Sequence, residues 1–97
     1  MSKIVVNMVG MLRLIFGRSS IEVLTDQELT FRDLLLIISA EAGKDFFPYL
    51  SERETEKILP DILIFVNGEN LLHLKGFDTL LADGDAITIM RADMAGG

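Results

Sequence analysis

The chain has 97 residues, a formal net charge of -6 at pH 7 and 49% apolar residues. This length suffices for one domain with its own hydrophobic core and is too short for two. The acidic excess repels nucleic-acid backbones and anionic lipid headgroups, so we expect neither nucleic acid nor a membrane as a partner. The chain has no cysteine and only one histidine, His73, which excludes a thiol nucleophile and a cysteine or histidine metal cluster. We therefore expect no metal site.

The most apolar segment spans residues 4–16 and bears on targeting. It is interrupted by Asn7, Gly10 and Arg13, and it falls short of the roughly 18 residues that a membrane-spanning helix needs. A secretory signal requires an unbroken apolar stretch and a small-residue cleavage site, and this broken segment follows only Lys3. The sequence therefore predicts a cytoplasmic protein.

The N-terminal third of the chain predicts a strand hairpin. Residues 4–9 and 20–24 are rich in β-branched residues and alternate in polarity, which is typical of half-buried strands. Residues 11–16 between them are too apolar for a free loop and end at Gly17. We expect this segment to form a short turn or helical connection packed on the core.

The central third predicts one main helix. Thr30 stands three residues before Asp33, as a helix N-cap does, and Gly43 supplies a left-handed C-terminal stop. The helix should therefore run from about residue 30 to 42. We expect Arg32 on its exposed face, where replacement by Ala should cost little. The buried face should hold the residues with helical spacing, Phe31, Leu34, Leu35, Ile38 and Ala42.

The longest connection should cover residues 44–60. It mixes aromatic residues with the charge run 52–57 and has no strand period. We expect an irregular segment that can include a helical turn, with the charge run on a solvated loop.

The last third predicts three further strands. Residues 61–66 form an apolar strand that ends at Asn67-Gly68, a strong turn signal, and residues 71–74 should form the short return strand. Residues 83–85 predict a tight turn before the final strand at 86–90. The order β-β-α-β-β-β predicts an α+β fold, in which one main helix packs across one face of a mixed β-sheet.

Few residues could carry catalysis. Asp83 and Asp85 flank Gly84 and have no third ligand nearby in the sequence, so a structural role in the turn is favoured over a metal or acid–base pair. His73 has no companion nucleophile motif. A phosphate-binding glycine-rich loop with Lys and Ser/Thr is absent from the sequence. We therefore expect no cofactor to be bound stably.

The chain ends in Gly96-Gly97, a pair that arises by chance about once in 200 sequences. A frayed end or a cloning remnant is the simplest alternative interpretation. The element order and this terminus together resemble the ubiquitin-like β-grasp proteins, most closely the sulfur-carrier family of the molybdopterin synthase small subunit (MoaD/ThiS-like). The resemblance rests on segments 64–68 and 80–85 and on the diglycine. The prolines and valine that often precede the diglycine in this family are missing from residues 91–95.

The resemblance implies a carrier and not an enzyme by itself. Residues 1–92 should form the β-grasp domain and residues 93–97 a flexible tail. A ubiquitin-activating-type enzyme would use ATP to adenylate the carboxyl group of Gly97, and a sulfur donor would convert it to a thiocarboxylate. Gly96, Ala95 and Met94 would thread into the partner's site, where the small glycine avoids a clash. The molybdopterin synthase large subunit or another sulfur acceptor would then receive the sulfur.

Two alternatives stay open. A ubiquitin-like modifier would join Gly97 to lysines of target proteins by the same activation chemistry. A non-covalent β-grasp binding module would have an inert tail. The sequence also leaves open whether the pathway makes molybdenum cofactor, tungsten cofactor, thiamine or thiolated tRNA.

The face of the sheet opposite the helix is a candidate partner surface. With Ile4, Val6 and Met8 facing inward, the outward strand residues include Val5, Leu63, Phe65 and Met90. We expect these four residues to form an apolar patch that docks the activating enzyme and the large subunit. Alternatively, the connection 44–60 covers part of the patch.

Overall fold

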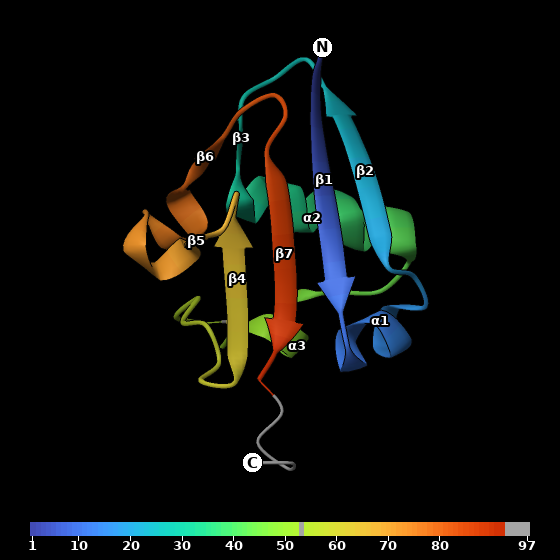
Figure 1. Cartoon of the computed structure of the whole chain (residues 1–97), viewed down its shortest axis with the longest axis vertical. Coiled ribbons are helices and arrows are strands. Elements are labelled where there is room, and N and C mark those ends of the chain that lie inside the picture. Colours follow the sequence, from blue (N-terminus) through green and yellow to red (C-terminus); the bar gives the residue numbers. More distant parts are fainter. Residues whose placement is uncertain (53, 93–97) are drawn as a thin grey trace.

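The computed structural model describes residues 1–52 and 54–92. Five strands form one mixed sheet in the order β2-β1-β7-β4-β5, and α2 lies across one face of it (Figure 1). The predicted tail, residues 93–97, lies outside the described residues, and the domain boundary after residue 92 stays a prediction. The sheet strands are β1 (Ser2–Val9), β2 (Ser20–Thr25), β4 (Ile62–Val66), β5 (Glu69–Asn70) and β7 (Ala86–Arg91). Among the described residues, no helix is long and apolar enough to span a membrane.

The two central strands set the inward and outward sides of the sheet. β1 pairs with β2 in an antiparallel hairpin and with β7 in parallel, and β7 pairs with β4 in antiparallel. Side chains alternate between the two faces because successive strand residues point in opposite directions. The predicted alternation is confirmed. The residues that face α2 are buried and comprise Ile4, Val6, Met8, Ile21, Val23, Ile62, Ile64, Val66, Ile87 and Ile89.

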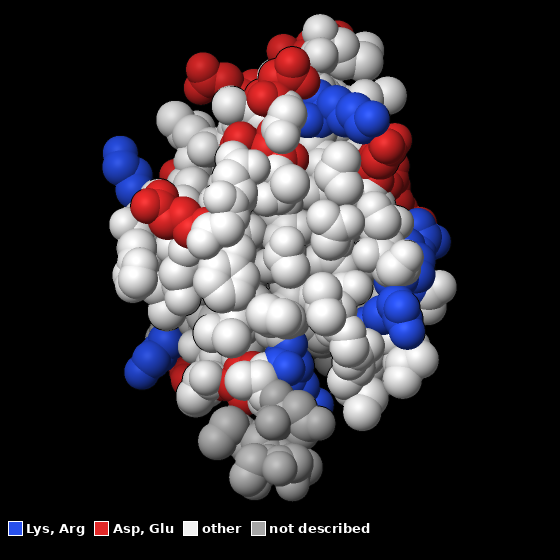
Figure 2. Space-filling view, in the orientation of Figure 1, with Lys and Arg blue, Asp and Glu red and all other residues white. Residues whose placement is uncertain are grey.

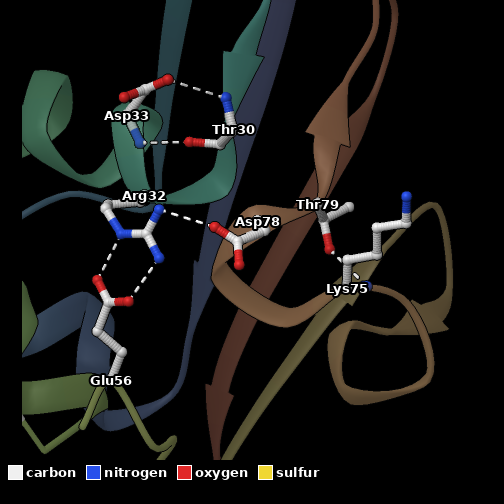
Figure 3. A network of polar contacts seen from close by, with 7 residues as sticks. All are labelled: Thr30, Arg32, Asp33, Glu56, Lys75, Asp78 and Thr79. Atoms are coloured by element: carbon white, nitrogen blue, oxygen red, sulfur yellow. Dashed lines mark hydrogen bonds and ion pairs between the residues drawn. The ribbon is translucent and has the colours of Figure 1, made fainter.

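Helix α2 (Phe31–Ala42) begins and ends where the sequence predicts. The hydroxyl of Thr30 accepts the N–H of Asp33 at 3.2 Å, and the carboxylate of Asp33 accepts the N–H of Thr30 at 3.1 Å, which completes a capping box (Figure 3). Gly43 ends the helix with φ of 66°. The buried residues of the helix are Phe31, Leu34, Leu35 and Ile38, as expected, whereas Ala42, also expected there, is only partly buried and packs against the core.

Two short helices lie at the end of the domain where β7 finishes (Figure 1). The predicted helical connection is α1 (Met11–Phe16), and the long connection holds α3 (Phe47–Leu50). The ring of Phe16 stacks on the ring of Phe46 with centroids 3.8 Å apart, which fixes α1 against this connection. The connection passes behind the sheet, on the side of α2 (Figure 1).

The predicted return strand at residues 71–74 is wrong. The chain returns at once as β5, which pairs with β4, and residues 71–73 form the 3-10 helix η1 (Leu71–His73). The side chain of Asn70 accepts the N–H of Leu72 at 2.9 Å, and this cap favours a helical turn over a strand. Leu71 is then fully buried. The other elements, not predicted individually, are η2 (Gly76–Asp78) and a small sheet of β3 (Leu29–Thr30) and β6 (Leu80–Leu81).

Candidate functional site

The last described strand, β7, lies in the middle of the sheet. β7 lies between β1 and β4, and its last residue, Arg91, pairs with Ile62. Asp61 accepts two hydrogen bonds from this end of the chain. Its backbone oxygen accepts a hydrogen bond from the N–H of Ala92 at 2.6 Å, and its carboxylate accepts one from Nε of Arg91 at 2.9 Å. The point from which the tail starts is therefore fixed. The four residues predicted to carry or thread the reactive group, Met94, Ala95, Gly96 and Gly97, lie outside the described residues.

The open face of the sheet carries three of the four predicted patch residues close together. Leu63 lies opposite Met90 in the β4–β7 pairing, and Phe65 lies opposite Thr88 on the same face. All three apolar side chains are half-buried by their neighbours. In Figure 2 the centre of this face is free of charged side chains. The connection 44–60 lies on the other side of the sheet, so it does not cover them.

The fourth predicted residue, Val5, lies apart from the other three. Val5 lies opposite Ala86 on β7, whereas Met90 lies four residues further along β7. The outward-facing pair Asn7 and Thr88 lies between these two positions. The position that the patch prediction missed is Val9, which lies opposite Met90 in the parallel pairing and is 43% exposed. Its outward position follows from the alternation of the first strand, which could have identified it. We call Val9, Leu63, Phe65 and Met90 the open-face patch.

The two aspartates of the tight turn have structural partners, as expected. The carboxylate of Asp83 accepts the N–H of Lys3 at 2.8 Å. The carboxylate of Asp85 accepts the N–H of Ala82 at 2.8 Å and Nδ2 of Asn67 at 2.9 Å, which ties this turn to the β4–β5 turn. Within residues 1–52 and 54–92, no group of three or more His, Asp or Glu residues could hold a metal ion.

His73 lies on η1 and is exposed. It borders a surface pocket with Leu74, Lys75, Thr79 and Leu80. Thr79 is buried, and its hydroxyl accepts a hydrogen bond from the backbone N–H of Lys75 at 3.0 Å (Figure 3). Among the described residues of this pocket, His73 and Thr79 form no hydrogen bond with each other, so they do not make the nucleophile–base pair that hydrolytic chemistry requires.

An ion-pair network that sequence reasoning missed joins three segments. Arg32 on α2 donates from Nε and Nη2 to both carboxylate oxygens of Glu56, and from Nη1 to Asp78 on η2 at 2.9 Å (Figure 3). Glu56 belongs to the charge run that was expected to be solvated. These hydrogen bonds lower the pKa of the Glu56 carboxyl and raise the pKa of Arg32. No local sequence signal could have identified the pairing, because its members lie 24 and 46 residues apart.

A mixed five-stranded sheet with one main helix across one face, and with the last strand at its centre, is the β-grasp fold of ubiquitin-like proteins. No protein-family model matches the chain. A putative sulfur carrier protein of Archaeoglobus fulgidus is 37% identical over 71 residues, which cover 73% of this chain and 77% of the relative. Small archaeal modifier protein 3 of Haloferax volcanii is 32% identical over 87 residues and 88% of both chains. The chain therefore belongs to the family of ubiquitin-like sulfur carriers and small archaeal modifier proteins.

Solved structures agree with this assignment. A chain of the BexX/CysO complex of Amycolatopsis orientalis superposes with a TM-score of 0.79 and 25% identity, covering 97% of this chain and 99% of that one. The putative molybdopterin converting factor subunit 1 of Pyrococcus furiosus shares the fold, with a TM-score of 0.71, 22% identity and coverage of 96% and 100%. Members of this family are small carriers and modifiers and not catalysts, which confirms the expectation that the chain is not an enzyme by itself.

Proposed function

We propose that this sulfur carrier holds sulfur as a thiocarboxylate on the α-carboxyl group of Gly97. The observation that carries the proposal is the fixed start of the tail, where Asp61 holds both Arg91 and Ala92 at the end of a central strand. A fully extended chain of five residues spans at most about 18 Å. The carboxyl group can therefore enter a partner's site while the folded domain stays on the partner's surface.

The chemistry explains why a partner must act first. A carboxylate resists attack by a nucleophile because it is negatively charged, whereas an acyl adenylate carries a good leaving group. A ubiquitin-activating-type enzyme would join the Gly97 carboxylate to AMP from ATP and release pyrophosphate. A sulfur donor would then displace AMP. The chain itself has no phosphate-binding loop, so ATP would be bound by the enzyme. We place this activity in the cytoplasm, where ATP is available.

We propose molybdopterin as the product that receives the sulfur, through a molybdopterin synthase large subunit. Support comes from the resemblance of segments 64–68 and 80–85 and of the diglycine to the synthase small subunit. The likeness to the Pyrococcus furiosus protein adds support at the level of fold. Complementation tests this step: the gene should restore molybdopterin in a strain that lacks only the synthase small subunit. Restoration of thiamine or of tRNA thiolation alone would replace the proposed pathway by another.

The open-face patch is the proposed docking surface for both partners. Leu63 and Met90 present apolar area at the end of the sheet where β7 ends, and Phe65, opposite Thr88, extends that area toward the middle of the sheet. An apolar surface beside a reactive tail suits a partner that must hold the domain while the tail reacts.

A second candidate function is conjugation to proteins. The modifier from Haloferax volcanii aligns with 88% of this chain, which favours a bond between Gly97 and target lysines. The activation step is the same, but the acyl group ends on a lysine amine and not on a sulfur atom. A single chain could perform both reactions.

Mass spectrometry separates the candidate functions. The protein should be incubated with the adenylating enzyme of its own cell, ATP and a sulfur donor. Its last peptide should then gain the mass of one oxygen-to-sulfur exchange. Gly97-linked lysine peptides in the native cell would establish conjugation. A tail that stays unmodified in both experiments would favour the non-covalent binding module.

A further inference from the structure

Charge is distributed unevenly over the two ends of the sheet. Asp26, Glu28 and Asp83 lie together at the end where β1 begins. Arg13 belongs to α1, and Arg18 follows it on the way to β2; both are exposed at the opposite end. In Figure 2, Lys and Arg side chains gather along the lower right edge, where Figure 1 places α1 and the start of β2. A basic edge is notable on a chain with a formal charge of -6.

These two arginines differ from Lys3, Arg32 and Arg91, which form ion pairs, and they share the lack of an acidic partner with the described Lys44, Lys57 and Lys75. Lys3 pairs with Glu22, and Arg91 pairs with Asp61. Within residues 1–52 and 54–92, neither Arg13 nor Arg18 has an acidic partner within 4.0 Å. Their charge is therefore available to a partner and is not used to hold the fold.

Apolar side chains lie beside the two arginines. Met11 and Leu14 on α1 are 54% and 71% exposed, although helix residues of this kind are usually turned toward the core. The other side of α1 is firmly held. Leu12 and Phe16 are buried, and Nζ of Lys44 donates to the backbone oxygen of Ile15 at 3.0 Å. The exposed side chains therefore stand on a rigid support.

Helix α1 lies close to the end of β7, which is the last described strand before the tail. Val9, the last residue of β1, lies opposite Met90 near the end of β7, and α1 begins two residues later and contacts β7. The surface formed by Met11, Arg13, Leu14 and Arg18, which we call the α1 edge, thus continues the open-face patch at the end from which the tail leaves.

We infer that the α1 edge docks an acidic, partly apolar surface beside the tail-receiving site of the enzyme that activates Gly97. Arg13 and Arg18 would face carboxylates of that enzyme, and Leu14 and Met11 would contact its apolar side chains. The inference rests on the proposed activation of Gly97 and adds the chemistry of the partner's surface. Complementary charge would speed the encounter and orient the tail toward the site.

A protein partner fits these observations better than nucleic acid does. The overall negative charge opposes binding to a polyanion, and two arginines neutralise few phosphates. Exposed Leu14 and Met11, which share α1 with Arg13, offer apolar contacts that a phosphate backbone cannot use. Binding to RNA is therefore treated as an outcome that overturns the inference.

The experiment compares charge reversals of equal size. Arg13→Glu with Arg18→Glu is matched by Lys57→Glu with Lys75→Glu, because both doubles change the net charge equally and Lys57 and Lys75 lie outside α1. Stopped-flow binding to the purified adenylating enzyme should show an association rate lowered about tenfold or more for the α1-edge double relative to its match at low salt. The deficit should shrink as salt is added. Unfolding midpoints of both doubles should be recorded to show that each is folded.

An apolar pair completes the test. Leu14→Ser should raise the dissociation rate severalfold, whereas Leu72→Ser, at a leucine that is 64% exposed on η1, should not. The inference would be overturned if the two double variants had equal association rates and the two serine variants had equal dissociation rates. An α1-edge double that alters binding of a single-stranded RNA oligonucleotide but not of the enzyme would also overturn it. Failure of the wild-type chain to form any adenylate would instead refute the proposed function, so the two failures are distinguishable.

Discussion

Arg32 and Glu56 form a two-point ion pair that fastens the long connection to the main helix. Both carboxylate oxygens of Glu56 accept hydrogen bonds from one guanidinium group, and both side chains are 33% exposed. Glu56 adopts a left-handed backbone conformation with φ of 56°, which few residues other than glycine tolerate. A partner that holds its carboxylate offsets the cost of this conformation.

Arg32→Ala should destabilise the domain, contrary to the small effect that the sequence predicted. The change removes three charged hydrogen bonds and leaves the carboxylates of Glu56 and Asp78 without their shared cation. We expect a loss of about 1 to 2 kcal/mol in the free energy of unfolding, measured by urea titration. Arg32→Lys should recover only part of it, because an ammonium group cannot bind a carboxylate at two points with planar geometry. An unchanged midpoint for Arg32→Ala would mean that the network contributes nothing in solution.

The same pair should make stability depend on pH. The pKa of Glu56 is lower in the folded protein than in the unfolded chain, where a glutamate titrates near about 4.3. Its stabilising contribution is therefore fully present above that value and is lost as the pH falls through the folded pKa. Thermal unfolding between about pH 6 and pH 3 should show a smaller loss on acidification for Glu56→Gln than for wild type. Glu54→Gln, at an exposed neighbour, should follow the wild-type curve.

The sequence predicted the features that depend on nearby residues. Thr30, Asp33 and Gly43 mark the limits of α2 through contacts within one helical turn, and strand alternation follows from a period of two. The Arg32–Glu56 pair could not be predicted, because folding and not sequence proximity brings the two residues together. The return strand was misplaced for a different reason. Apolar content favoured residues 71–74 as the strand, but the side-chain cap from Asn70 favours a helical turn there.

Substitutions on the two sides of α2 test the helix phase. Leu34 is fully buried, whereas Leu36 is 55% exposed. Leu34→Ala should cost on the order of 2 to 5 kcal/mol, because it removes apolar contacts and leaves a cavity that neighbours fill only in part. Leu36→Ala should cost well under about 1 kcal/mol. Denaturant midpoints of the two variants measure the difference, and equal losses would contradict the assigned faces.

The open-face patch should matter more for binding than for folding. Phe65→Asp or Met90→Asp places a charge where a partner would exclude water, so affinity for the adenylating enzyme should fall at least about tenfold. The isolated variants should lose little stability, because both side chains already contact water in the free domain. Calorimetric titration and the unfolding midpoint should be measured together. Leu72→Asp, on η1 and away from the sheet face, is the control and should retain affinity. A large drop in the midpoint with unchanged affinity would show that these side chains serve the core.

Changes at the C-terminus should abolish the chemistry and leave the fold intact. All the core residues that the structure describes lie at or before Ile89, and the last strand pairing joins Ile62 to Arg91. Deleting Gly97, or adding one alanine after it, displaces the carboxyl group by one residue from the position that the enzyme must adenylate. We expect no thiocarboxylate by intact-mass analysis and an unfolding midpoint within about 1 °C of wild type, since ends outside the packed core contribute little stability. Gly97→Ala keeps the length of the chain and adds one methyl group. It therefore distinguishes a requirement for the position of the carboxyl group from a requirement for a residue without a side chain. Slow loading of this variant would indicate a narrow channel, whereas normal loading would show that the position of the carboxyl group matters and the absence of a side chain does not.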